Sequence, residues 1–160
     1  MGAHSGVRSN LRLKSMLLPA LLLATPAVAH AQEVLTEISP EAMAKLLTSM
    51  GLEVEPVKQE GDSANPALNL ELGGYRVVLF LANGNTDAQL FAGFSDAKVK
   101  KDKINEWNQR HRFGRAYIDK DGDPVLESDI DFTGGVTRAN IKAWVKIYRD
   151  LLVEFAKSVN

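Results

Sequence analysis

Three aspartates at alternate positions are the chain's nearest approach to a cation site. They match positions 1, 3 and 5 of a calcium-binding loop, where carboxylate oxygens surround a hard cation: Asp119, Asp121 and Asp123. Pro124 then stands where such a loop has glycine, and Ile130 stands where it has a bidentate glutamate. The flanking segments 117–118 and 125–126 have strand-forming residues. We therefore interpret the segment as a hairpin turning at Asp121-Gly122, with weak cation binding at its acidic tip as the alternative.

A second acidic set follows at two-residue spacing, which places its members on one face of a strand: Glu127, Asp129 and Asp131. Such a set could hold a metal or supply a hydrolase with an acid and a base. The simpler interpretation is a solvated, charged strand face that resists aggregation. The opposite face of the same strand is mainly apolar: Leu126, Ser128, Ile130 and Phe132.

His111 is the only histidine after residue 31, and the chain has no cysteine. Paired-histidine zinc motifs and cysteine nucleophiles are therefore excluded from residues 32–160, and a serine triad would depend on this one side chain. Neither a Gly-x-Ser-x-Gly elbow nor a Gly-x-x-x-x-Gly-Lys phosphate loop is present. We expect His111, near a helix end, to interact with free helix carbonyls. The sequence thus argues against an enzyme and calls for no cofactor.

The densest mixture of aromatic and cationic side chains lies at 105–117, and it holds our candidate partner-binding residues: Trp107, Asn108, Arg112, Phe113, Arg115 and Tyr117. We expect Trp107 and Phe113 to be core residues and Asn108 to satisfy free backbone groups near the helix end. The arginines either pair with nearby acids, which we favour, or line a recognition surface with Tyr117.

Three predicted helices position these residues. The first follows Ser39-Pro40 and ends at Gly51, the second ends at Gly114, and the third follows Thr137. The third has apolar residues at helical spacing over about six turns: Ile141, Trp144, Val145, Tyr148, Leu151, Leu152, Phe155 and Val159. These residues predict a helix with one buried face.

Strand patterns fill the intervals between the helices. A short edge strand is expected at 52–57, then strands at 67–72, 75–81 and 89–94, the first two of them joined at Gly73-Gly74. The unbroken apolar run at 75–81 predicts a central strand with both faces covered. The order is one helix, three or four strands, one helix, two strands and one helix. This order predicts an α+β fold with a mainly antiparallel sheet.

Residues 1–31 have the features of a secretory signal peptide. Arg8, Arg12 and Lys14 precede an apolar stretch at 16–29, and Ala29-His30-Ala31 is a cleavage site, with Ala27-Val28-Ala29 as a second candidate. Cleavage after Ala31 would leave one domain, 32–160, without a membrane span, in the periplasm or outside the cell. That domain has 16 basic and 20 acidic residues, so its net charge of −4 argues against nucleic-acid binding.

Two segments resemble the YbjN domain family, whose members are described as bacterial sensory transduction regulators: Lys103-Ile104-Asn105-Glu106-Trp107-Asn108 and Arg112-Phe113-Gly114-Arg115-Ala116-Tyr117. Segments 119–127, 74–78, 90–94 and 134–136 also fit, and the resemblance spans about 38–156. It implies a fold like that of type III secretion chaperones, whose relatives bind protein segments and often dimerise. It implies no catalytic residues.

Together, these features predict an exported, non-enzymatic binding or regulatory protein. Its partner would be another protein or a second copy of the chain. The alternatives are a small-ligand or cation-binding sensor, or a hydrolase with an acidic site around Asp119, Asp121 and Asp123.

Overall fold

The structure is a computed structural model that describes residues 1–2, 33–58, 65–95, 97 and 99–159. Residues Gln32–Asn160 form one compact unit. Apart from residues 1–2, the predicted signal peptide and its cleavage site lie outside the described residues.

The described residues of this unit form three helices and two antiparallel sheets. The helices are α1 (Pro40–Thr48), α2 (Lys101–Arg110) and α3 (Arg138–Val159). The strands are β1 (Val34–Leu35), β2 (Val54–Pro56), β3 (Ala67–Leu72), β4 (Tyr75–Ala82), β5 (Asp87–Gly93), β6 (Arg115–Ile118), β7 (Pro124–Asp131) and β8 (Val136–Thr137). The main sheet has the order β2-β3-β4-β5-β7-β6, and β1 pairs with β8 separately. The predicted α+β fold with a mainly antiparallel sheet is confirmed, whereas β1 and β8 were not predicted.

Local sequence signals account for the ends of several elements. Ser39 caps α1 by accepting a hydrogen bond from the Ala42 amide at 3.2 Å. Gly73 and Gly74 have φ values of +60° and +85°, and they form the two-residue turn between β3 and β4. The Thr137 hydroxyl accepts from the Asn140 amide at 3.2 Å at the start of α3.

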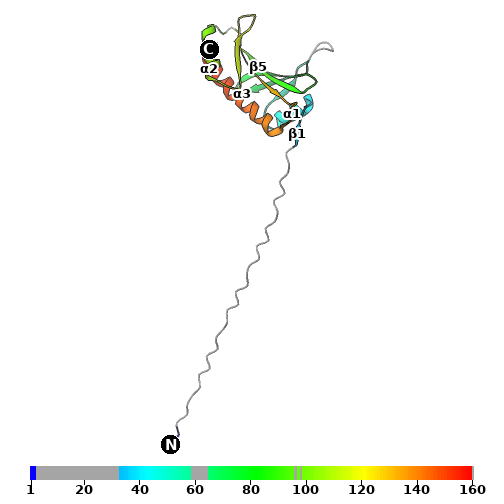
Figure 1. Cartoon of the computed structure of the whole chain (residues 1–160), viewed down its shortest axis with the longest axis vertical. Helices are drawn as coiled ribbons and strands as arrows, with labels where there is room; N and C mark the ends of the chain where they lie inside the picture. Colours follow the sequence, from blue (N-terminus) through cyan, green and yellow to red (C-terminus); the bar gives the residue numbers. More distant parts are fainter. Residues whose placement is uncertain (3–32, 59–64, 96, 98, 160) are drawn as a thin grey trace. The chain divides into compact units, whose positions relative to one another are not determined.

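Helix α3 lies over one face of the main sheet. Its buried stripe includes Trp144, Tyr148 and Phe155, and the facing positions of the strands are also buried: Leu68, Leu70, Leu72, Val77, Leu79, Leu81, Ala88, Leu90, Ala92 and Leu126. Figure 1 shows α1 near the start of α3 and α2 near its end. A ring contact supports the position of α2, because the ring centres of Phe155 on α3 and Trp107 on α2 lie 5.0 Å apart. Among the described residues, no helix is long and apolar enough to cross a membrane.

The other face of the sheet, which points away from α3, is only partly covered. The prediction that both faces of β4 are buried is wrong, because Val78 and Phe80 are only half-buried. Val78 pairs with Phe91 on β5, and the rings of Phe80 and Phe91 make an edge contact at 6.3 Å. Packing between neighbouring strands therefore replaces the second layer that the apolar run predicted.

Candidate partner-binding surface

The segment that joins α2 to β6, residues 110–115, holds three of the six predicted partner-binding residues: Arg112, Phe113 and Arg115. Trp107, one turn before the end of α2, is only 5% exposed. Its ring stacks on His111 at 3.5 Å and meets the ring of Phe155. Trp107 is therefore a core residue, as its helical register predicts, and little of it is accessible to a partner.

His111 is held at the end of α2 by both of its ring nitrogens. Nδ1 lies 3.0 Å from the Trp107 carbonyl oxygen, and Nε2 lies 3.1 Å from Oε1 of Glu154 on α3. The His111 amide also donates to the Trp107 carbonyl at 3.0 Å. The prediction that this histidine interacts with a helix carbonyl is confirmed. Because both nitrogens already have partners, His111 is a poor candidate for a general base.

Asn108 closes the outer edge of the main sheet. Its Nδ2 donates to the Ala116 carbonyl at 2.9 Å, and its Oδ1 accepts from the Ala116 amide at 3.0 Å. These are the two bonds that another strand would make to β6 at this position. Asn108 therefore satisfies backbone groups, but they belong to strand β6 and not to the helix end where we expected them. It protects an edge that would otherwise be free to pair.

Phe113 is a solvent-exposed aromatic residue whose backbone is fixed from inside the protein. It is 63% exposed, and its φ of +67° lies in the left-handed region that residues other than glycine rarely occupy. Its carbonyl accepts from the Ser128 hydroxyl at 2.6 Å, and Trp144 Nε1 donates to the same hydroxyl oxygen at 3.0 Å. Ser128 and Trp144 are both buried. The prediction of a core Phe113 is wrong, because neither helical nor strand periodicity extends through this left-handed turn.

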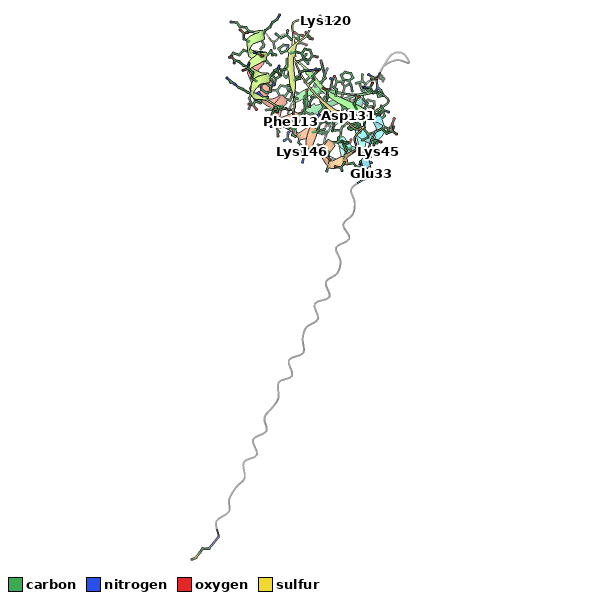
Figure 2. All side chains as sticks on the ribbon, viewed as in Figure 1. Glu33, Lys45, Phe113, Lys120, Asp131 and Lys146 are labelled. Carbon is green, nitrogen blue, oxygen red and sulfur yellow. The ribbon has the colours of Figure 1, made fainter. Side chains whose placement is uncertain are left out.

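Gly114 lets the same segment lie close to α3. A Cβ atom at this position would lie 3.2 Å from Leu151 Cδ1 and 3.3 Å from Leu126 Cδ1. Ile147, one turn before Leu151 on α3, is 40% exposed. Figure 2 labels Phe113 beside α3. We call Arg112, Phe113 and Ile147 the junction patch.

Arg112 supports the exposed ring of Phe113. Its guanidinium carbon lies 5.0 Å from the centre of that ring, within the range of a cation–π contact. Among the described residues, neither Arg112 nor Arg110 forms a salt bridge with a carboxylate. The junction patch therefore combines apolar surface with uncompensated positive charge.

Arg115 and Tyr117 belong to a different group, on the sheet face that points away from α3. Arg115 forms an ion pair with Glu127 Oε1, and the Tyr117 hydroxyl donates to Glu127 Oε2 at 3.1 Å. Glu127 is only 3% exposed. The interpretation of Glu127 as part of a solvated face is wrong, because side chains of the neighbouring strand cover it. Arg115 is therefore paired with an acid of the same chain, which is the alternative that we favoured for the arginines.

The remaining carboxylates of that strand have separate partners. Gln89 donates to Asp129 Oδ1 at 2.8 Å, and the Thr133 hydroxyl donates to Asp131 Oδ1 at 2.7 Å. The hydrogen bonds from the Thr133 hydroxyl and amide hold the pKa of Asp131 below its usual value. Within the described part of the chain, no three or more acidic, histidine or cysteine side chains gather as metal ligands.

The predicted hairpin at 119–123 is confirmed. Asp119 Oδ1 accepts from the amides of Asp121 and Asp123 at 3.0 and 2.9 Å, and Gly122 has a φ of +89°. This carboxylate therefore shapes the turn that joins β6 to β7. Figure 2 labels Lys120 at the tip of the turn, away from Phe113.

Sequence patterns placed Trp144 on the buried face of α3, but they did not connect Trp144 or Ser128 with the junction patch. Ser128 was visible as a polar residue on an otherwise apolar strand face, which is the one signal that could have singled it out. Tyr148 has a related structural role, because its hydroxyl donates to the Leu126 carbonyl at 2.7 Å. Burial raises the pKa of Tyr148 far above its usual value, so the phenol stays protonated as a donor.

Two comparisons with known proteins give matches. The model of the YbjN family, described as "Putative bacterial sensory transduction regulator", matches residues 39–160. A solved structure, the crystal structure of YbjN described as "a putative transcription regulator from E. coli", has a TM-score of 0.53 and 14% sequence identity. The match covers 75% of this chain and 93% of that one, and at this identity it shows the fold alone. No curated protein matches the sequence. The predicted likeness to secretion chaperones stays a prediction.

Proposed function

The chain belongs to the YbjN family, and on that basis we propose that it is a non-enzymatic regulatory protein that recognises a protein partner through the junction patch. The family is described as one of sensory transduction regulators, and we infer that this chain regulates by binding a partner. The observation that carries the proposal is an exposed aromatic side chain, Phe113, on a backbone that buried hydrogen bonds hold in place.

Such an arrangement suits recognition for an energetic reason. Binding costs about 0.5–1.5 kcal/mol for each side chain that must be immobilised, and ordering a loop adds to that cost. Here the backbone of Phe113 is already fixed through Ser128 and Trp144, so folding has ordered it before a partner arrives. Aromatic and arginine side chains also provide much of the binding energy at protein interfaces. Phe113 and Arg112 supply one of each.

The charges around the junction patch indicate the chemistry of the partner. Arg110 and Arg112 lack carboxylate partners among the described residues, whereas Glu154 is taken up by His111. A complementary surface would offer an apolar pocket for the Phe113 ring with carboxylates at its rim. A second copy of the chain is one candidate partner, because symmetric dimers of identical chains are the commonest soluble oligomers.

We also propose that the protein acts outside the cytoplasm, without nucleic acid. The basic, apolar and small-residue segments of 1–31 support export, and the net charge of −4 over 32–160 argues against a nucleic-acid partner. The absence of enzymatic activity is supported by His111, whose two nitrogens are engaged, and by the separate partners of Glu127, Asp129 and Asp131.

Site-specific photocrosslinking in cells of the source bacterium tests the proposal. A benzophenone amino acid replaces Phe113 in one variant, Ile147 in a second and Lys120 in the β6–β7 turn in a third. We expect one defined protein adduct from positions 113 and 147 and none from 120. An adduct of twice the chain's mass would identify the partner as a second copy.

The arginine is tested in the Ile147 probe variant, where Phe113 remains in place. Arg112→Ala should weaken the adduct, whereas Lys120→Ala should leave it unchanged. Equal adducts from all three probe positions, or none from position 113, would contradict the proposal.

A further inference from the structure

A second surface feature is a pocket of about 230 Å³ between the end of α1, β3 and the first half of α3. Its apolar lining consists of Met50, Leu52, Leu72 and Val145, and its polar lining consists of Ser49, Lys142, Lys146 and Arg149. None of these lining residues is acidic. The pocket therefore joins an apolar floor to a cationic rim.

The three cations of the rim come from one side of α3. Positions 142, 146 and 149 are separated by four and three residues, so their side chains follow each other along the helix. Among the described residues, Lys142 and Lys146 have no salt-bridge partner, and Lys142 is half-buried. Within the described part of the chain, Arg149 bonds only the adjacent Asp150, through Nε at 3.0 Å and Nη2 at 2.7 Å in an exposed pair.

The end of α1 does not explain the lysines. Free carbonyls at a helix C-terminus attract cations, and they would give Lys142 and Lys146 an ordinary structural role. Each of the last four carbonyls of α1 already accepts a hydrogen bond from the following turn. The donors to residues 45, 46, 47 and 48 are the Ser49 amide at 3.0 Å, the Ser49 hydroxyl at 2.6 Å, the Met50 amide at 2.9 Å and the Gly51 amide at 2.9 Å.

We propose that this pocket binds a small amphiphile with one anionic head group, a carboxylate or a phosphate, and a short apolar body. The head would meet Lys142 and Lys146 at the rim, and the body would cover the floor around Leu72 and Val145. The volume lies below the roughly 300–1,000 Å³ of pockets for drug-sized ligands, so the ligand is small. This site goes beyond the proposed partner recognition and shares no residue with the junction patch.

The test is a methyl NMR titration of the full chain with four probes that share an eight-carbon tail: octanoate, octyl phosphate, octanol and octylamine. We expect saturable shifts of the Leu72 and Val145 methyl signals with one or both anionic probes. The two anionic probes show which head group is preferred. Octanol should bind at least about tenfold more weakly, since a charged hydrogen bond is worth roughly one such factor in affinity. Octylamine should produce no shift.

A variant pair isolates the lysines. The double variant Lys142→Gln, Lys146→Gln should lower the affinity for the anionic probe about tenfold. The control double variant, Lys101→Gln with Lys157→Gln, removes the same amount of charge elsewhere and should leave that affinity unchanged. The proposal would be overturned if the wild-type chain bound octanol or octylamine as tightly as the anionic probes. The absence of shifts at Leu72 and Val145 with every probe would also overturn it, and crosslinking at Phe113 would be unaffected by either result.

Discussion

The two ends of β6 are joined to their neighbours by short, highly charged segments that are held in opposite ways. The junction at 110–115 is fixed by contacts from β7 and α3: His111 with Glu154, Phe113 with Ser128, and Gly114 with Leu151. The turn at 119–123 is held by its own atoms, mainly by Asp119 with the amides of Asp121 and Asp123. The junction is therefore held by residues from other elements, whereas the turn is held by hydrogen bonds within its own five residues.

The difference separates two uses of a surface segment. The turn exposes polar side chains and sets the register of a hairpin, which requires nothing from the rest of the chain. The junction exposes Phe113 in a left-handed conformation, which costs roughly 1–3 kcal/mol and persists only where the surroundings enforce it. An exposed aromatic side chain that the interior holds in a strained backbone is better explained by recognition than by stability. Four sets of variants test this difference.

Among changes within the two segments, the largest effect should come from a substitution of Gly114. Gly114→Val should lower the free energy of unfolding by about 3 kcal/mol, because the added side chain would press on Leu151 and Leu126. Gly122→Asn in the turn should cost less than about 1 kcal/mol, since nothing lies within 4 Å of its Cβ position and asparagine tolerates a positive φ. Urea denaturation measures both changes. Equal costs would show that the junction is no more tightly packed than the turn.

A smaller loss should follow from Ser128→Ala. The substitution leaves Trp144 Nε1 and the Phe113 carbonyl without their shared partner, and an unsatisfied buried group costs about 1–3 kcal/mol. Asp119→Ala in the turn, where water can replace the carboxylate at the exposed Asp121 amide, should cost about 0.5–1 kcal/mol. A double-mutant cycle of Ser128→Ala with Trp144→Phe should show a coupling of about 1 kcal/mol. Additive effects would mean that the bond between them contributes nothing to holding Phe113.

The closed edge of β6 predicts a third contrast, between two asparagines of the same helix. Asn108→Ala should lower the free energy of unfolding by about 1–2 kcal/mol, because Ala116 loses both of its outer hydrogen bonds. Asn105→Ala, at an exposed position of α2, should stay within about 0.5 kcal/mol. Analytical ultracentrifugation adds a second measurement, since a freed edge favours self-association. If the two variants had the same stability and the same tendency to self-associate, Asn108 would not be the residue that protects the edge of β6.

Sequence patterns predicted the parts of this molecule that depend on local repetition. The apolar stripe of α3, the Gly73-Gly74 turn and the alternation of β3 follow from backbone periodicity, and they were found where expected. The faces of β7 were also assigned correctly, with Leu126 and Ser128 inward.

The errors occur where distant segments decide the environment of a residue. The backbone of Phe113 is fixed by Ser128, 15 positions away, and Glu127 is buried because Arg115 and Tyr117 cover it from the next strand. No repeat in the sequence encodes either contact. A polar residue on an apolar strand face, such as Ser128, was the only local sign of this arrangement.

The smallest change in stability is the most informative about the junction, and it comes from Phe113→Gly. Glycine accepts a φ of +67° without strain, and this gain offsets its larger backbone entropy in the unfolded chain. The free energy of unfolding should therefore stay within about 0.5 kcal/mol of wild type, while Phe155→Ala, which removes a fully buried ring, should cost about 3–5 kcal/mol.

In the Ile147 crosslinking variant, the same Phe113→Gly change should abolish the partner adduct. If the adduct is lost while the free energy of unfolding is unchanged, the Phe113 side chain serves recognition and not folding. A loss of stability approaching that of Phe155→Ala would instead show that Phe113 is held in place for the fold, and the contrast between the two ends of β6 would then concern packing alone.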